Sequence, residues 1–170
     1  GGLYILDIQT GKILSRYWSG GKNEYYFPFD NLLNVYEDPD GSYWIGTNGS
    51  GLVHWNKGKP LNRHNNAELL LNAYRPSSGL YEQFTSIHGL SNNVIYAVSP
   101  DTFDNLWLPS DYGLMRFNKY STRTQTYLTA DGISHNEFNR VSHYQAADGT
   151  LYFGGLNGIT VFHPNTFSDT

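Results

Sequence analysis

Residues 89–118, GLSNNVIYAVSPDTFDNLWLPSDYGLMRFN, form a unit whose parts recur in the same order on both sides of it. Its pair Gly113-Leu114 matches Gly51-Leu52 upstream and Gly158-Ile159 downstream, at offsets of 62 and 45 residues. The pair Gly2-Leu3 fits the same pattern, 49 residues before Gly51. An aromatic residue stands six or seven positions ahead of each of the three complete matches, and these residues are Trp44, Trp107 and Tyr152. The chain is therefore built from repeats.

A turn rich in Asp, Asn and Gly precedes each of these three aromatic residues. The turns are 38–41 (DPDG), 101–105 (DTFDN) and 148–149 (DG), and their residues tolerate left-handed or side-chain-bonded backbone. A period near 45 residues that carries several short strands is typical of a β-propeller blade. The sequence thus predicts an all-β fold, a β-propeller segment of about three and a half four-stranded blades. Because propellers close with roughly four to eight blades, we expect the segment to belong to a larger propeller of about seven.

The composition fits such a fold and excludes several classes of protein. The 18 glycines and 14 tyrosines suit many tight turns and half-buried strands, and a charged fraction of 15% argues against disorder. A formal net charge of -4, without a basic stripe, disfavours nucleic acid as a partner. No apolar run approaches the ~20 residues of a spanning helix, so we expect no direct membrane contact by this segment. The absence of cysteine excludes disulfides and leaves the compartment open.

Strand counting divides residues 1–170, a single propeller segment, into four parts. We expect a half blade at 1–18, a blade at 29–86 with an insert at 56–79, a blade at 90–128, and a final blade at 133–167 that lacks its outer strand. The expected strands are 31–37, 43–47, 52–55, 81–86, 94–99, 106–108, 114–117, 125–128, 138–145, 151–153 and 159–162, besides a hairpin around Gln9-Thr10-Gly11. The insert holds a candidate two-turn helix at 67–74 and a basic patch, for which a solvated loop is the favoured interpretation.

Alternation within these strands predicts which side chains pack between or within blades. The expected buried residues are Ile5, Val35, Trp44, Val53, Trp55, Val98, Trp107, Phe117, Tyr152 and Phe162. A sugar-stacking role for the repeated aromatics is the weaker interpretation, because a residue found at the same position of every blade is better explained by packing. Both ends of the segment expose open faces in this scheme, so we expect them to be covered by the remaining propeller blades or by a second copy of the chain.

The repeated copies resemble a known family. The stretches GLSNNVIYAVSPD (89–101) with NLWLPSDYGLMRFN (105–118), and NLLNVYEDPDGSYWIGTNGSGLVHWN (31–56), resemble the two-component regulator propeller repeat. The final copy, DGISHNEFN (131–139) with DGTLYFGGLNGITVFHP (148–164), resembles the last blade of such propellers. The middle copy departs from the family pattern at Pro109-Ser110, where Gly-Thr is usual.

This resemblance implies the periplasmic sensor region of a Bacteroidetes hybrid two-component histidine kinase, which detects oligosaccharides released from glycans. It implies an oligosaccharide ligand, a homodimeric parent receptor, no cofactor and no catalysis by this segment itself. Two other classes stay open, a glycan-degrading propeller lyase or hydrolase and a protein-interaction scaffold. Fold analogy alone is a poor argument for the enzyme, which would need a metal cluster or paired carboxylates.

Candidate ligand-binding residues follow from topology. In a propeller, the loop that enters each inner strand and the loop between the second and third strands open on one face, and here they hold polar side chains suited to a hydroxyl-rich ligand. The candidates are Asp30, Asn31, Asn48, Asn92, Asn93, Asp111, Tyr112, His135, Asn136, Glu137 and Asn157. For any single one of them, a turn-forming role is the favoured alternative. The histidines show no HExxH or HxH spacing and no GxSxG motif is present, so neither a metal site nor a nucleophile elbow is predicted.

Overall fold

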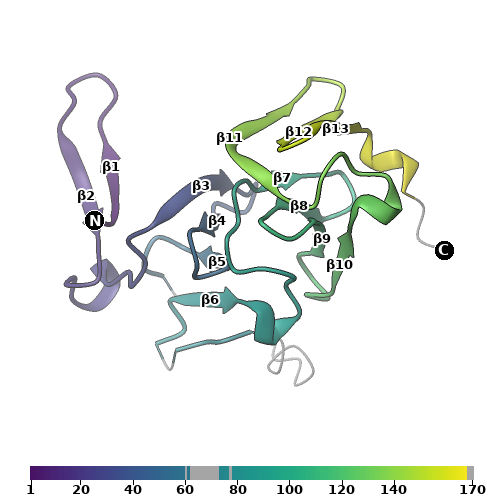
Figure 1. Cartoon of the computed structure of the whole chain (residues 1–170). Coiled ribbons are helices and arrows are strands. Elements are labelled where there is room, and N and C mark those ends of the chain that lie inside the picture. Colours follow the sequence, from purple (N-terminus) through teal and green to yellow (C-terminus); the bar gives the residue numbers. More distant parts are fainter. Residues whose placement is uncertain (60, 62–72, 77, 168–170) are drawn as a thin grey trace.

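The computed structural model describes residues 1–59, 61, 73–76 and 78–167, which form four antiparallel sheets that follow one another along the chain (Figure 1). The first two sheets consist of β1 (Leu3–Leu6) and β2 (Ile13–Tyr17), then β3 (Leu32–Glu37), β4 (Tyr43–Thr47), β5 (Leu52–Trp55) and β6 (Tyr81–Phe84). The last two consist of β7 (Ser99–Pro100), β8 (Asn105–Pro109), β9 (Leu114–Asn118) and β10 (Thr124–Tyr127), then β11 (Phe138–Gln145), β12 (Leu151–Gly155) and β13 (Gly158–Phe162). Short 3-10 helices lie between and after the sheets, namely η1 (Asn23–Tyr25), η3 (Ser86–His88), η4 (Thr129–Asp131) and η5 (Pro164–Thr166).

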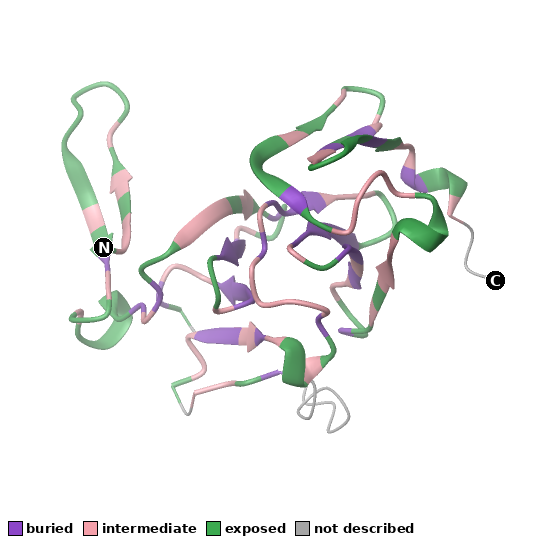
Figure 2. Ribbon diagram, in the orientation of Figure 1, coloured by how far each residue is buried: buried purple, intermediate pink, exposed green. Residues whose placement is uncertain are grey.

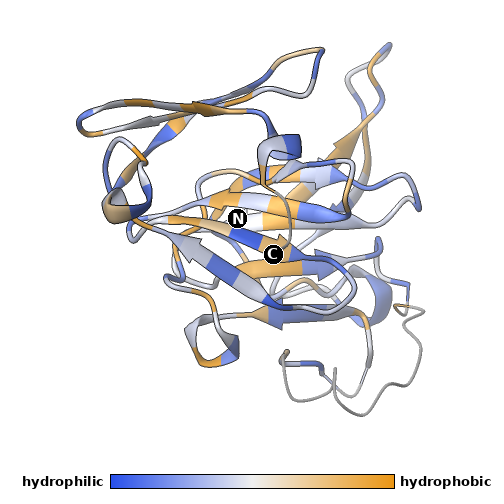
Figure 3. Cartoon of the chain, turned by 90° about the vertical axis from the view of Figure 1, so that its right-hand side faces the viewer, coloured by the Kyte–Doolittle hydropathy of each residue, from blue (hydrophilic) through white to orange (hydrophobic). Residues whose placement is uncertain are grey.

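Within each sheet the strands are neighbours in chain order, which is the meander of a propeller blade. The β1–β2 hairpin stands at one end of the molecule and the β11–β13 sheet lies at the other (Figure 1). Hydrophobic residues concentrate along the strands, whereas the connecting loops are mostly hydrophilic (Figure 3). The predicted all-β fold with four-stranded units is confirmed. No helix in the described part of the chain is long and apolar enough to cross a bilayer.

The inner strand of the β7–β10 sheet differs from the expectation of a strand over 94–99. Only β7, two residues long, pairs as a strand, and the residues before it divide their N–H groups between two sheets. Ile95 N donates to Thr47 O of the preceding sheet at 2.9 Å, whereas Tyr96 N donates to Pro109 O of its own sheet at 2.9 Å. A segment bonded alternately to two sheets cannot form a continuous ladder with either, so the predicted strand was wrong over most of its length.

Each pair of adjacent sheets encloses its own apolar core, and the buried residues concentrate on β4, β5, β6, β8 and β9 (Figure 2). The core between the second and third sheets contains Trp44, Leu52, Phe84, Leu106, Leu108, Met115 and Phe117. The core between the third and fourth sheets contains Trp107, Leu114, Phe138, Leu151 and Phe153. The other face of the second sheet packs against the β1–β2 hairpin and the linker after it, through Tyr17, Phe27, Phe29, Ile45, Val53, Trp55 and Tyr81.

Most of the residues expected to be buried are so. Trp44, Val53, Trp55, Val98, Trp107 and Phe117 are buried, and Ile5 and Phe162 are partly buried and packed against a core. The prediction was wrong for Val35, which is 43% exposed, and for Tyr152, which is 36% exposed. Val35 lies on a part of β3 that the β1–β2 hairpin does not reach, and Tyr152 lies on the outer face of the final sheet. Both therefore face positions that no described sheet fills.

The insert ends against the outer strand of the second sheet. The helix expected at 67–74 lies outside the described residues except for Ala73 and Tyr74, and Tyr74 forms an isolated bridge with Gln83 of β6. Arg75 follows, and its Nε lies 2.5 Å from Oε1 of Glu82, whose side chain is 2% exposed. The return of the insert is thus fixed to β6 by a buried ion pair.

Candidate functional site

The loops that carry the candidate residues meet at one end of the sheets. Gly49 N donates to Asn93 O at 3.0 Å, and Gly113 N donates to Asn136 O at 2.6 Å. In both cases the loop between the second and third strands of one sheet is tied to the loop that enters the next sheet. Candidate residues from successive sheets therefore share one rim, which we call the mouth.

Three of the candidate asparagines have their amide oxygens engaged inside the fold. Asn92 Oδ1 accepts the backbone N–H two residues later at 2.7 Å, which is an Asx turn. Asn93 Oδ1 accepts from Ser86 N at 2.7 Å, and Asn136 Oδ1 accepts from Thr129 N at 2.8 Å. The last two bonds are equivalent in successive repeats. They fix the 3-10 turn before each inner segment. These side-chain oxygens therefore form turns, as the alternative to ligand binding predicts.

Other candidates present their side chains to solvent. The exposed ones are Asp30, Asn31, Asn48, Tyr112, Glu137 and Asn157. Asp30 accepts from Ser19 Oγ at 3.3 Å, and Tyr112 is held in place through its carbonyl oxygen, which accepts from Ser91 Oγ at 2.6 Å. His135 is half-buried, and its Nδ1 accepts from Glu137 N at 3.0 Å. These side chains are available at the rim of the mouth.

Asp111 forms a side-chain hydrogen bond at the mouth. It accepts a hydrogen bond from the hydroxyl of Tyr96, which the segment before β7 directs to it. Burial, together with this bond and the charge of Asp111, raises the pKa of Tyr96 to about 12. Tyr96 is therefore a neutral donor at physiological pH, and its carboxylate partner has its remaining lone pairs for other donors.

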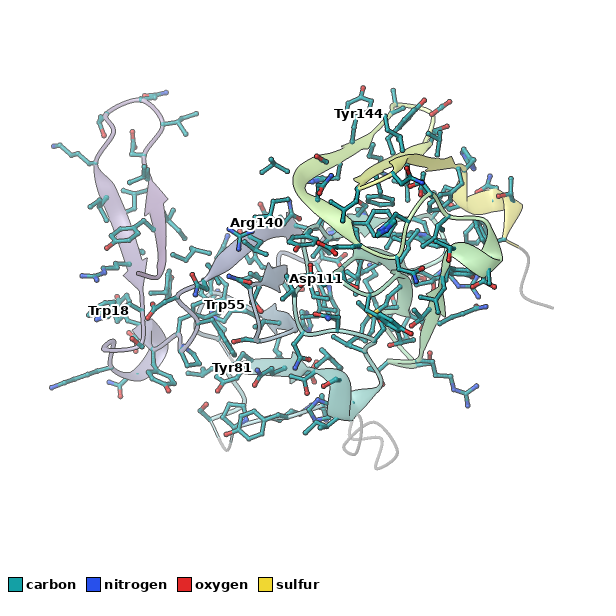
Figure 4. All side chains as sticks on the ribbon, in the orientation of Figure 1. Trp18, Trp55, Tyr81, Asp111, Arg140 and Tyr144 are labelled. Carbon is teal, nitrogen blue, oxygen red and sulfur yellow. The ribbon has the colours of Figure 1, made fainter. Side chains whose placement is uncertain are left out.

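Two further charged side chains stand near this pair. The charge of Arg140 lowers the pKa of Tyr96 and the charge of Glu137 raises it, so both act on the same hydroxyl. Figure 4 shows Asp111 and Arg140 near the middle of the molecule, at the centre of the fan of sheets. Sequence reasoning selected Asp111 and Glu137 but missed Tyr96 and Arg140, because it considered only loops. The sequence feature that could have indicated Tyr96 is its hydroxyl group within the otherwise apolar segment 94–98, VIYAV.

The inner segments of three sheets are also joined by one asparagine. Asn34 of β3 accepts from Val98 N at 2.9 Å through its Oδ1, and its Nδ2 lies 3.3 Å from Nε2 of His143 on β11. Burial lowers the pKa of His143, which keeps the ring neutral near pH 7. A neutral ring nitrogen can accept from the amide. Asn34 thus links the inner segments of the second, third and fourth sheets to one another.

A hollow of about 510 Å³ lies away from the mouth, on the outer face of the final sheet. It is lined by Val141, Ser142, His143, Tyr144, Tyr152, Gly154, Gly155, Gly158 and Ile159. None of the eleven predicted site residues lines it. Tyr152 stands at the position that Trp44 and Trp107 hold in the preceding sheets, where the next sheet covers them. The hollow is therefore an uncovered packing face.

One constellation has the connectivity of a hydrolytic triad. Nε2 of His54 lies 2.8 Å from Oγ of Ser42, and its Nδ1 lies 3.2 Å from Oε2 of Glu82. The three residues are only 2–5% exposed. The Ser42 hydroxyl donates to Asp40 at 2.6 Å, so its oxygen accepts from His54 rather than giving it a proton. The arrangement therefore holds the histidine ring between the Ser42 oxygen and the Glu82 carboxylate and offers no accessible nucleophile.

Among the described residues, no three or more His, Asp or Glu side chains gather as possible ligands of a metal ion. The chemistry that the mouth offers is that of hydrogen bonding. Its groups are a tyrosine hydroxyl, carboxylates, a guanidinium, amides and the exposed ring of Tyr112, which is 51% accessible. Such groups bind and orient polar ligands.

Parts of this chain are similar in sequence to known proteins. Residues 26–49 match the family described as Two component regulator propeller. A curated relative, Histidine kinase P4 of Formosa agariphila, is 35% identical over 81 residues, which are 48% of this chain and 6% of that protein. The chain thus spans a small part of that relative.

Solved structures share the fold. The extracellular domain of a hybrid two-component system of B. thetaiotaomicron matches 99% of this chain with a TM-score of 0.67 and 21% identity, and a second such domain from the same organism matches 98% with 0.52 and 24%. The chain covers 21% and 26% of those two chains. The structure of a streptogramin B lyase matches 82% of this chain at 11% identity with a TM-score of 0.51, which shows a likeness of fold alone.

These findings confirm the resemblance seen in the repeats. The match at 26–49 covers the entry to β3, the strand itself, the turn after it and β4, which are the inner half of the second sheet. Residues 26–49 are therefore a two-component regulator propeller repeat, and the fold built around them is a segment of a β-propeller.

Proposed function

We propose that this chain is part of the extracytoplasmic, periplasmic sensing region of a hybrid two-component histidine kinase, and that it binds glycan-derived oligosaccharides at its mouth. Binding would be relayed to a kinase on the other side of the membrane by a homodimeric parent receptor. The propeller repeat and the extracellular domains of similar fold support the class of receptor.

The observation that carries the ligand is the convergence of polar groups from consecutive sheets on one rim. Tyr96 and Asp111 from the third sheet lie beside the charges of Glu137, at the entry to the fourth sheet, and of Arg140 on β11. Tyr112 adds an exposed aromatic ring from the same loop as Asp111. Paired donors and acceptors beside a flat apolar ring match a sugar, which offers hydroxyls around its edge and C–H groups on its faces.

A binding experiment tests this site. Isothermal titration of the chain with a panel of neutral oligosaccharides should identify a ligand, and Asp111→Asn and Tyr112→Ala should each weaken its binding about tenfold, a loss of about 1.4 kcal/mol. The matched control is Tyr120→Ala. Tyr120 is 68% exposed in the turn after β9, at the opposite end of that strand from Tyr112, so its loss should leave the affinity unchanged.

The same mixtures decide between binding and catalysis. We expect each oligosaccharide to be recovered intact, because the Ser42–His54–Glu82 group is sealed and its hydroxyl is engaged by Asp40. New reducing ends or unsaturated products after incubation, absent in a blank without protein, would overturn the non-catalytic assignment. Equal affinities of the wild type, Asp111→Asn and Tyr112→Ala would remove the mouth from the proposal.

A further inference from the structure

The contact between the second and third sheets shows how one blade holds the blade before it. Lys119, in the turn after β9, donates from Nζ to Asp38 at 3.1 and 2.8 Å, across the boundary between the two sheets. Asp38 also accepts from Nε1 of Trp44 at 3.0 Å. The lysine and aspartate side chains are 14% and 11% exposed. A lysine of one sheet thus binds the aspartate that accepts the tryptophan N–H of the preceding sheet, and we call this ion pair the clamp.

The second sheet carries the same cation at the same position. Lys57 follows Leu52 by five residues, as Lys119 follows Leu114. Its side chain is 39% exposed, and the carboxylate that the structure gives it is Glu37 of its own sheet, at 3.7 Å and 60% exposed. The described residues before it provide no aspartate at this boundary. Lys57 therefore occupies the position equivalent to Lys119, but no aspartate of a preceding sheet pairs with it among the described residues.

The face of the second sheet that the β1–β2 hairpin covers is left partly exposed on its inner strand. Val35, Ile45 and Val53 form one cross-strand row of the second sheet. Ile45 and Val53 are 0% exposed under the β1–β2 hairpin and its linker, whereas Val35 on the inner strand is 43% exposed. The hairpin supplies two strands, β1 and β2, and in the described residues β1 pairs with β2 alone. Its other edge lies on the side of β3 (Figure 1).

We propose that the open edge of β1 and the exposed part of β3 accept a two-stranded antiparallel β-hairpin that completes the first blade, and that Lys57 clamps an aspartate of this hairpin. The internal repeats define its chemistry. In both complete sheets an aspartate precedes the tryptophan of the second strand by six residues, Asp38 with Trp44 and Asp101 with Trp107, and accepts its indole N–H. The occupant therefore carries Asp and Trp at this spacing, pairs with β1 through its second strand, and covers Val35 with its first.

An intact second copy of the chain does not fit this role. Its only described Asp–Trp hairpins are β3–β4, which is paired with β5, and the segment ending in β7 with β8, which is paired with β9. Either would have to leave its own sheet, and with it a buried tryptophan, before it could add to β1 of another molecule. The hairpin must come as a free element from a polypeptide that does not already hold it in a blade.

A synthetic peptide with the sequence of residues 31–47 is a direct probe, since it contains Asp38 and Trp44. It should bind the 170-residue chain with a stoichiometry of one and protect the amides of β1 from hydrogen exchange. Lys57→Met should weaken binding about tenfold, and Asp38→Asn in the peptide should do the same. Combining both changes should cost no more than either alone, because they remove the same ion pair. The control is Lys59→Met, an equal change of charge two residues on, which should bind like the wild type.

Three results would overturn the proposal. One is no binding of the peptide. The second is binding that Lys57→Met and Lys59→Met weaken equally, which would reflect net charge only. The third is protection of β1 that rises with the concentration of the chain in the absence of peptide, since the occupant would then be a second copy.

Discussion

Tryptophan and aspartate change together along the repeats. Nε1 of Trp107 donates to Asp101 at 2.9 Å, as that of Trp44 does to Asp38. In the final sheet the aromatic residue is Tyr152, and the position six residues before it is Ala146. The tyrosine has no indole N–H to satisfy and no acceptor is supplied at this position, whereas the indoles of Trp44 and Trp107 each have one. Because an unpaired buried donor costs about 1–3 kcal/mol, the polar partner follows the ring.

The two tryptophans of the second sheet should respond differently to replacement by phenylalanine. Trp44→Phe removes the donor to buried Asp38 and should cost about 1–3 kcal/mol beyond the loss of ring contacts. Trp55→Phe should cost less, because its buried indole N–H has no hydrogen-bond partner among the described residues and the equivalent position in the next repeat is Phe117. Urea unfolding of both variants at pH 7 measures the difference. Equal losses of unfolding free energy would contradict the role given to Asp38.

Replacing Trp107 by alanine empties a fully buried position. Trp107→Ala should therefore lower the free energy of unfolding by ~3–5 kcal/mol, which urea unfolding measures.

Asp40 should make stability depend on pH. Burial acts to raise its pKa, but hydrogen bonds from the Ser42 hydroxyl and N–H outweigh this, and the net effect lowers it. A carboxyl group whose pKa is lower in the folded state stabilises above its unfolded pKa of about 3.9, and this contribution disappears as the pH falls through the folded value. We therefore expect Asp40→Asn to be less stable than the wild type at pH 7 and the gap to narrow below pH 4. Urea titrations at pH 7, 5 and 3 test this, and a constant gap would refute it.

Among the elements, strands with local signals were predicted best. The bounds of β4, β5 and β11 coincide with the expectation, because their turns and alternating apolar residues lie within the strand's own neighbourhood. The segment before β7 failed, because its N–H groups are shared with the preceding sheet, which no local pattern encodes. Loop topology predicts a binding site at the mouth, and the structure ties these loops to one another, but loop topology does not select Tyr96 and Arg140. Their role depends on which loops of different sheets meet.

The space around the first glycine of each repeated Gly-Leu or Gly-Ile pair depends on whether its sheet has an outer strand. Gly51 and Gly113 have φ of +78° and +85°, and a Cβ at either would collide with the carbonyl oxygen of the outer strand, at Phe84 and Tyr127. Gly158 has φ of +119°, and a Cβ there would meet nothing within 4 Å. In the part of the chain that the structure describes, the final sheet has three strands, and the space beside Gly158 is open.

Alanine substitutions should separate the two effects. Gly158→Ala should cost about 1 kcal/mol, because only the left-handed backbone is strained. Gly51→Ala should cost more, ~2–4 kcal/mol, since overpacking against the backbone of β6 adds to the same strain. Thermal or urea unfolding of the two variants gives the comparison. A larger loss for Gly158→Ala would mean that an outer strand occupies that edge in solution.

At the scale of the whole molecule, the sheets cover one another in sequence and leave the outer face of the final sheet uncovered. Tyr144, Tyr152, Ile159 and Val161 on this face are 36–65% exposed, and the first three line the hollow of about 510 Å³. In the earlier sheets the corresponding face is closed by the next sheet. Exposed contiguous apolar surface of this kind favours association.

The isolated chain should therefore associate through this face when no further blade is supplied. A two-fold contact between two such faces would bury the same residues on both copies. Sedimentation velocity over increasing concentration should show mass rising above 19.3 kDa. Val161→Lys, which places a charge beside Tyr152 in the cross-strand register, should shift the chain toward monomer. Ile87→Lys is the control, because Ile87 is 86% exposed on η3, outside this face, and its replacement should leave the association unchanged. A compact monomer at every concentration, in the wild type as in Val161→Lys, would show that the face is stable in water on its own.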